Sequence, residues 1–145
     1  VSIGVDDLSF VNPLNNQQIK PIVRIGSGDF HDLFRNIVEN AKRHGFGENF
    51  HDGQIHIAAS FLQQEQMLEL VFMNNGTPLP EGMDTRRFVL RGEKAGNFGN
   101  TGTGGYHIKS IMDHVGGTLE VSNVLEHSFS VQIKLLFPIS HDEAP

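Results

Sequence analysis

The sequence predicts a two-layer α/β sandwich, in which helices cover one face of a mixed, mostly antiparallel sheet. Two segments carry apolar residues at helical spacing, and several others alternate apolar and polar residues with the period of a strand. The chain has 145 residues, which is the size of one domain. A chain of this size buries roughly 70% of its unfolded surface, so these observations favour one core shared by strands and helices.

The start of the chain carries weak signals. Residues 1–21 alternate apolar and polar residues only briefly before the polar run NPLNNQQ, so we expect an N-terminal extension or a weak hairpin. A short strand is expected over residues 21–25. The following Ser-Gly-Asp offers side-chain oxygens that cap a helix, and the apolar spacing predicts this helix over about residues 30–44. Gly45 and Gly47 predict its end.

Two strands joined by a turn are expected in the middle of the chain. Residues 54–62 and 67–73 place apolar side chains at alternate positions, and residues 63–66 between them are polar, as in a hairpin. Residues 74–82 are rich in turn-forming residues. The stretch over about residues 81–101 is long and irregular, which is typical of a lid, a binding loop or a disordered segment.

The last part of the domain predicts one helix and two strands. The helix follows GNFGNTGTGG and covers about residues 106–115, where a pair of glycines ends it. Strands are expected over residues 118–124 and 129–137. Residues 139–145 form a tail, so the domain itself is predicted to span residues 22–138.

Composition and charge exclude several classes of function. With 11 basic and 17 acidic residues the formal charge is −6, so we expect no nucleic-acid partner, because phosphate binding requires a basic surface. Cysteine is absent, which excludes disulfides and thiolate chemistry, and the eight scattered histidines do not suggest a metal cage. No apolar run approaches the length of a membrane span. We therefore expect a cytoplasmic domain without membrane contact.

The chain begins with valine and has no charged-then-apolar leader. We interpret it as a piece of a longer parent protein, whose membrane anchor and dimeric state the sequence leaves open.

Basic residues gather in one short stretch. Arg86, Arg87, Arg91 and Lys94 place four of the eleven basic side chains within nine residues. In an acidic protein such a cluster suits a small anion, although a solvated loop has the same composition.

Two asparagines lie on one face of the first predicted helix. Asn36 and Asn40 are four residues apart, with Arg43 and His44 near the same edge of the apolar stripe. Asparagine is a modest helix former, so its repeated use suggests a polar site. An ordinary polar helix face explains the same residues.

A glycine cluster, formed by Gly99, Gly102, Gly104 and Gly105, precedes the second helix. Glycines allow close approach of the backbone to a ligand, and the helix start offers free amides. A glycine cluster followed by a helix therefore suits phosphate. The cluster fits neither the P-loop nor the dinucleotide template, and a hinge remains the alternative. Further upstream, the asparagine of the NNGTPLP turn can donate to and accept from a purine edge.

Taken in order, these segments resemble the motifs of one superfamily. LFRNIVENAKRHG resembles the N box of the GHKL group, which contains gyrase, heat-shock chaperone, histidine kinase and mismatch-repair ATPases. MNNGTPLP and TGTGGYHIKSIMDHVGGTLEV resemble its first and second glycine boxes, and Phe88 resembles the phenylalanine of its F box. The resemblance covers about residues 22–138 and is closest to sensor histidine kinases. It implies the Bergerat fold and an ATP-binding catalytic domain.

The resemblance also implies roles for single residues. Asn40 matches the ligand of the magnesium ion that bridges the phosphates of ATP. Asn36 takes the position where hydrolysing members carry a glutamate, and an amide cannot take a proton from water. The catalytic positions are Asn36, Asn40 and Arg43. The implied ATP-binding residues are Asn36, Asn40, Arg43, His44, Asn74, Gly76, Arg91, Lys94, Gly102, Thr103, Gly104, Gly105 and Tyr106.

The chain departs from the family at two positions. Asn74 replaces the aspartate that reads adenine, and Pro78 replaces a glycine of the first glycine box. The resemblance implies a partner that accepts the phosphoryl group, either a helix pair with a histidine or a response-regulator-like protein. Two alternatives stay open, namely a serine kinase of the anti-sigma type and a non-catalytic interaction module with a degenerate nucleotide pocket.

Overall fold

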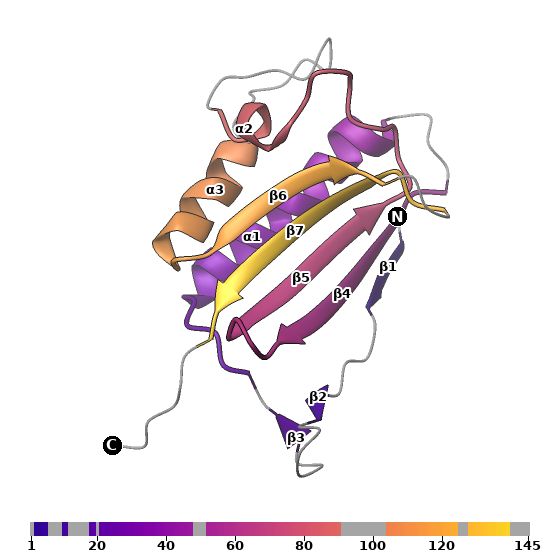
Figure 1. Cartoon of the computed structure of the whole chain (residues 1–145). Helices are drawn as coiled ribbons and strands as arrows, with labels where there is room; N and C mark the ends of the chain where they lie inside the picture. Colours follow the sequence, from indigo (N-terminus) through magenta and orange to yellow (C-terminus); the bar gives the residue numbers. More distant parts are fainter. Residues whose placement is uncertain are drawn as a thin grey trace.

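The computed structural model describes residues 2–5, 10–11, 18–19, 21–47, 52–90, 104–124 and 128–139. Five strands form the main sheet in the order β1-β4-β5-β7-β6 (Figure 1). β1 runs parallel to β4, and the other neighbours are antiparallel. The bounds are β1 Ser2–Val5, β4 Gln54–Leu62, β5 Met67–Asn74, β6 Thr118–Asn123 and β7 Val131–Pro138. Two further strands, β2 (Phe10–Val11) and β3 (Gln18–Ile19), form a small separate hairpin.

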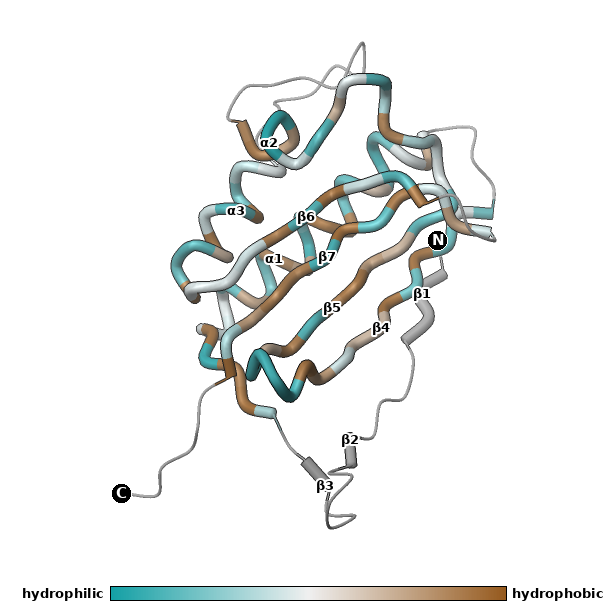
Figure 2. The backbone as a smooth tube through the Cα atoms, viewed as in Figure 1, coloured by the Kyte–Doolittle hydropathy of each residue, from teal (hydrophilic) through white to brown (hydrophobic). Residues whose placement is uncertain are grey.

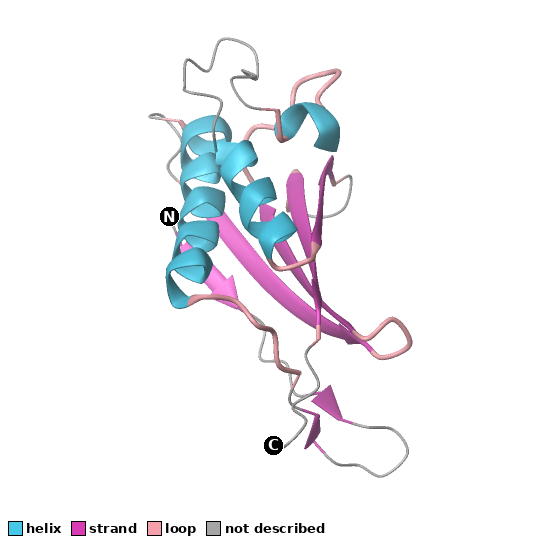
Figure 3. Cartoon of the chain, turned by 90° about the vertical axis from the view of Figure 1, so that its left-hand side faces the viewer, coloured by secondary structure: helices cyan, strands magenta, loops and turns pink. Residues whose placement is uncertain are grey.

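The main helices lie on one face of this sheet. α1 (Ser27–Asn40) continues into a π-helical turn, η1 (Ala41–Phe46), and α3 (Gly104–His114) packs beside α1. Figure 3 shows both long helices on the same side of the sheet. The short helix α2 (Thr85–Phe88) contacts β6. The predicted two-layer α/β sandwich with a mixed, mostly antiparallel sheet is therefore confirmed.

The core lies between the helices and the inner face of the sheet. β7 alternates buried and half-buried residues along its whole length, and Leu135 at its centre is completely buried. Ile37 of α1 and Ile108 and Met112 of α3 meet this face. Figure 2 shows that the central strands are largely hydrophobic along their length. Burial of these side chains is the main favourable term for folding, because it removes apolar surface from water.

Several elements differ from the prediction. The domain was expected to begin at residue 22, but β1, within the segment expected to be an N-terminal extension or weak hairpin, pairs with β4 at the edge of the main sheet. The short strand expected over residues 21–25 is wrong, since only Ile22 makes an isolated bridge. The first helix begins at Ser27 and its π-helical turn runs through Gly45 to Phe46. The turn continues because the carbonyl of Gly45 accepts a hydrogen bond from the Thr77 N–H at 2.7 Å, a tertiary contact that the local sequence does not reveal. The stretch expected to be irregular contains α2, while its residues 91–101 lie outside the described part of the chain.

Candidate functional site

A small pocket, partly open to solvent, lies between α1, the sheet and the segment around α2. Its two polar lining residues are asparagines, Asn40 at the end of α1 and Asn74 at the end of β5. The remaining lining residues are apolar: Ile37, Ala41, Ile55, Phe72, Met73, Leu79, Phe88, Val121, Val131 and Ile133. A mostly apolar cavity with a few placed polar groups is typical of a site for a small molecule.

Asn40 connects the pocket to the start of α3. A Cβ built on Gly104 would lie 3.6 Å from Asn40 Nδ2, which is ordinary van der Waals contact. The first turn of α3 therefore lies against the Asn40 amide, although the two are far apart in the sequence. An amide and the N-terminal end of a helix, with its unpaired N–H groups, are thus brought together.

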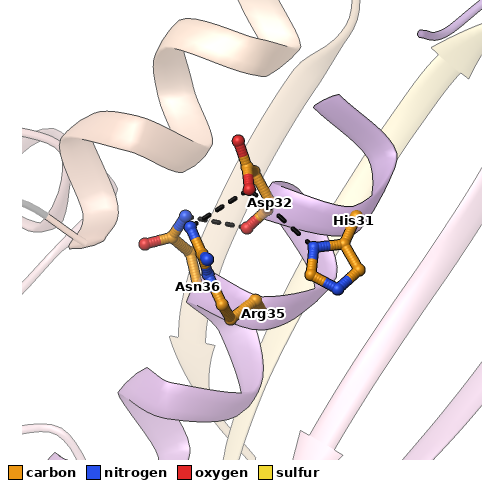
Figure 4. A network of polar contacts seen from close by, with 4 residues as sticks. All are labelled: His31, Asp32, Arg35 and Asn36. Carbon is orange, nitrogen blue, oxygen red and sulfur yellow. Dashed lines mark hydrogen bonds and ion pairs between the residues drawn. The ribbon is translucent and has the colours of Figure 1, made fainter. Parts of the chain in front are cut away.

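Asn36 is placed differently from Asn40. Its Nδ2 donates to the carbonyl of Asp32 at 2.7 Å, one turn earlier on the same helix (Figure 4). The Asp32 carboxylate in turn pairs with Arg35 at 3.1 Å and lies 3.9 Å from His31 Nδ1. Asn36 is not among the residues that line the pocket. In this structure its amide forms a hydrogen bond within the helix, and its contact with phosphates stays a prediction.

Asn74 is the only buried polar side chain of the described core, with 8% of its surface exposed. Its Oδ1 accepts a hydrogen bond from the Gly76 N–H at 3.0 Å, and its backbone carbonyl accepts from the Ser130 N–H at 2.8 Å. The turn after β5 therefore holds the side chain of Asn74, and the residue before β7 holds its backbone. The asparagine chosen from the sequence as a base-reading group does lie in the pocket.

Two glycines, Gly45 and Gly76, bring the turn after β5 against the end of the first helix. A Cβ built on Gly76 would lie 2.5 Å from the backbone of Gly45, far inside van der Waals contact. Gly76 was predicted as a ligand residue, and the structure gives it this packing role. The sequence analysis used Gly45 only as the end of the helix. It missed that Gly76 must lack a side chain because the backbone of Gly45 lies against it.

Gly105 and Phe88 form a second close approach. A Cβ on Gly105 would lie 1.9 Å from the Phe88 carbonyl oxygen, so the start of α3 and the end of α2 touch through their backbones. Phe88 also lines the pocket. The neighbouring Tyr106 is exposed, and its ring meets that of His107 at 5.8 Å between centroids. Gly105 thus sets the position of a pocket wall.

Arg43 and His44 lie in the π-helical turn η1 and do not line the pocket. Arg43 is exposed, whereas His44 is half-buried. Burial lowers the pKa of His44 below its usual value, and the positive charge of Arg43 lowers it further. His44 is therefore neutral at pH 7.

Four predicted binding residues, Arg91, Lys94, Gly102 and Thr103, lie outside the described residues, as does Gly99. The other two members of the basic cluster, Arg86 and Arg87, belong to α2 and are exposed. Their predicted role toward an anion stays a prediction.

Sequence reasoning missed two side chains that fix the segment around α2 to the edge of β6. The Thr85 hydroxyl accepts from the Val121 N–H at 2.9 Å and donates to the Val121 carbonyl at 3.3 Å. Asn123 does the same for Leu79, accepting from its N–H at 2.8 Å and donating to its carbonyl at 3.3 Å. No local pattern announces these contacts, because each joins positions that are far apart in sequence.

The described residues fit a magnesium ion that is held mainly by the phosphate oxygens of a bound nucleotide and by water. They contain no group of three or more histidine or acidic side chains that could bind a metal. Magnesium in phosphate sites keeps water and phosphate oxygens and needs only one or two protein ligands. The Asn40 amide, beside the start of α3, can supply one such oxygen. Within the same described part, no helix is long and apolar enough to cross a membrane.

The fold and the pocket define the class of protein first: an α/β domain with a pocket between its helices and its sheet. Comparison with known sequences defines the family. Residues 27–139 match the family described as histidine kinase-, DNA gyrase B- and HSP90-like ATPase, which is more than half of the chain. The chain belongs to this family. A search of curated protein sequences found no significant match.

Solved structures of histidine kinases share the fold. The nucleotide-free catalytic domain of histidine kinase ThkA is 20% identical with a TM-score of 0.59, over 94% of this chain and 76% of that one. The mycobacterial sensor histidine kinase MprB is 17% identical with a TM-score of 0.66, over 95% of this chain and 80% of that one. Full-length ShkA in complex with AMPPNP is 17% identical with a TM-score of 0.68, over 99% of this chain and 27% of that one. The architecture is thus that of histidine-kinase ATP-binding domains.

Proposed function

We propose that this chain is the nucleotide-binding catalytic domain of a cytoplasmic histidine-kinase-type protein. It binds a magnesium–nucleoside triphosphate, with ATP as the reference ligand, and donates the γ-phosphoryl group to a histidine of a protein segment outside this chain. The observation that carries the proposal is the meeting of Asn40 with the start of α3, beside a pocket that also contains Asn74. Family membership supports the same function.

The triphosphate lies at the end of the site where α3 begins. The first turn of a helix offers N–H groups without helical partners and a positive dipole end, and both favour phosphate. Asn40 lies against this turn with its Nδ2, so the oxygen of the same amide would be the protein ligand for magnesium. When bound, magnesium would neutralise negative charge that develops on the phosphates during transfer. Gly104 keeps the approach between Asn40 and α3 free of a side chain.

The base lies at the other end, in the apolar part of the pocket. Its walls come from α1, the strands and Phe88, and they suit a flat, mostly apolar ring. Asn74 is the polar group at this end, and an amide can hydrogen-bond the edge of a base. The two asparagines therefore address opposite ends of one nucleotide.

The reaction is transfer of the γ-phosphoryl group to an imidazole nitrogen of the acceptor. A nitrogen–phosphorus bond forms while the bond to the oxygen that bridges the β- and γ-phosphates breaks. The nucleoside diphosphate leaves with the bond electrons, and the imidazole proton passes to the acceptor protein or to water. By its resemblance to the family, Asn36 takes the position where hydrolysing members carry a general base, and an amide there disfavours hydrolysis. We propose a histidine-bearing helix pair, or a response-regulator-like protein, as the partner.

Isothermal titration calorimetry tests nucleotide binding. We would titrate non-hydrolysable analogues of ATP and GTP, with and without magnesium, into the wild type, Asn40→Ala and the neighbouring Glu39→Ala. Glu39 pairs with Lys42 at 3.5 Å, so its loss is the matched control on the same helix. Magnesium-dependent binding that only Asn40→Ala weakens, by about tenfold or more, supports the proposal. Absence of binding of both analogues at millimolar concentration, or full affinity in Asn40→Ala, contradicts it.

The acceptor is tested in the complete parent protein with radiolabelled γ-phosphate. Phosphohistidine is lost in acid and stable in base, whereas phosphoserine survives acid. An acid-labile label supports transfer to histidine. An acid-stable label identifies a serine kinase instead, and a protein that binds nucleotide but remains unlabelled is an interaction module.

A further inference from the structure

We propose that Ser130 is a positioning residue of the nucleotide site, because it holds the turn of Asn74 and Gly76 in the place where Asn74 meets the base. The inference rests on the proposed function, since the base belongs to the same nucleotide. Ser130 does not line the pocket, so it acts through Asn74 and not by touching the ligand. None of the segments that resemble family motifs contains Ser130.

Ser130 lies where the start of β7 meets the end of β5. The next residue, Val131, is opposite Asn74 in the pairing of these two strands (Figure 1). The Ser130 N–H donates to the Asn74 carbonyl at 2.8 Å. The Ser130 hydroxyl lies 3.3 Å from the same carbonyl and also bonds the carbonyl of Gly76. A hydroxyl carries a single proton, so the two carbonyls share one donor. Ser130 thus joins the first and the third residue of the turn.

These contacts close a ring of hydrogen bonds around the Asn74 side chain. The Gly76 N–H donates to Asn74 Oδ1 at 3.0 Å, while the Gly76 carbonyl accepts from Ser130 Oγ. Only the oxygen of an amide can accept from an N–H, so the bond from Gly76 sets the orientation of the Asn74 amide. The place of this amide therefore depends on Gly76, and the place of Gly76 depends on Ser130.

The peptide group between Gly76 and Thr77 is held from two directions. Its carbonyl accepts from Ser130, and its N–H donates to the Gly45 carbonyl at 2.7 Å. Gly76 is buried, so without the Ser130 hydroxyl its carbonyl loses a partner where little water can replace it, which costs free energy. The hydrogen bond from Thr77 to Gly45 remains. We therefore expect the turn to shift in Ser130→Ala while the domain stays folded.

A double-mutant cycle tests whether Ser130 acts through Asn74. Calorimetry measures the affinity for a non-hydrolysable ATP analogue with magnesium in the wild type, Ser130→Ala, Asn74→Ala and the double variant. Two residues that act through one contact show non-additive effects. We expect Ser130→Ala to weaken binding by about three- to tenfold, and to weaken it no further once residue 74 is alanine.

Two further variants serve as controls in the same titrations. Ser130→Thr keeps the hydroxyl and should restore the affinity. Ser60→Ala removes a hydroxyl from β4, where Ser60 is exposed and does not line the pocket, so its affinity should equal that of the wild type.

Hydrogen exchange in the nucleotide-free protein, followed by NMR, tests the position of the turn without a ligand. The Gly76 N–H is the donor to Asn74 Oδ1, so its exchange rate reports that hydrogen bond. We expect Ser130→Ala to raise this rate by about tenfold or more and to leave the rate of Leu135, at the centre of β7, unchanged. A role of Ser130 in global stability alone would raise both rates together.

Several results contradict the inference in distinguishable ways. Full affinity in Ser130→Ala, or a Ser130→Thr variant as weak as Ser130→Ala, overturns it and leaves the proposed nucleotide-binding function standing. Additive effects in the double variant, or an unchanged exchange rate at Gly76, remove the Asn74 turn as the cause. Where Asn74→Ala does not fold or bind, the affinity and the Gly76 exchange rate of Ser130→Ala decide together. Failure of the wild type to bind at millimolar concentration overturns the proposed function, and the positioning role with it.

Discussion

Gly76→Ala tests whether the β5 turn and the end of the first helix are held together by backbone contact. The three atoms nearest to a Cβ at this position are all backbone atoms of Gly45, at 2.5 to 2.6 Å. No rotamer change can relieve the clash, and Gly45 is itself tied to the turn through the hydrogen bond from Thr77. Gly76 lacks a positive φ, so the substitution reports packing and not backbone conformation.

Overpacking a tight core contact costs about 1–3 kcal/mol, and a rigid neighbour places Gly76→Ala at the upper end, about 2–3 kcal/mol. For a domain of this size the melting temperature falls by roughly 5–10 °C. Gly28→Ala is the matched control, because Gly28 lies in α1 with nothing within 4 Å of an added Cβ. It raises stability by up to about 1 kcal/mol. Differential scanning calorimetry on both variants measures the effect, and equal melting temperatures would refute the packing argument.

Two further predictions follow from the structure. Thr85→Val removes both hydrogen bonds to Val121 at nearly constant volume, so urea unfolding should show a loss of about 1–2 kcal/mol that Thr85→Ser largely restores. A serine as unstable as the valine would mean that the methyl group matters instead. The pKa of His44 is lowered in the folded state, so below about pH 6.5 the unfolded chain binds more protons at this residue, and this contribution to stability falls as the pH falls. Urea unfolding between pH 7.5 and 5 should therefore show a shallower pH dependence for His44→Gln, and parallel curves would contradict the assignment.

The fold could be predicted from the spacing of apolar residues, because that spacing reports which side chains are buried. The apolar spacing of α1 predicts its packing on the sheet, and its Leu33 and Ile37 are indeed buried. The alternation over β4 and β5 likewise predicts their inner face. Element ends were less predictable, since the π-helical turn after α1 depends on a hydrogen bond from Thr77, a residue beyond the next two strands.

The candidate site was predictable only in part, for the same reason. Asn40 and Asn74 could be chosen from their motifs, and the structure places both in one pocket. Asn36 belongs to the same motif as Asn40, yet its amide bonds Asp32 of its own helix. The anchoring role of Thr85 could not be predicted, because its partner Val121 lies 36 positions away.

The sequence by itself determined the arrangement of helices on a sheet, because periodicity and composition fix which faces are buried. Its motifs indicated the family and the residue types available to a ligand. Only the tertiary structure decided how these groups point. The Gly76 N–H donates to the side-chain oxygen of Asn74, a residue that lines the pocket. Whether an amide serves as donor or acceptor depends on the partner that meets it first, and that partner is set by packing between segments, which no local pattern encodes.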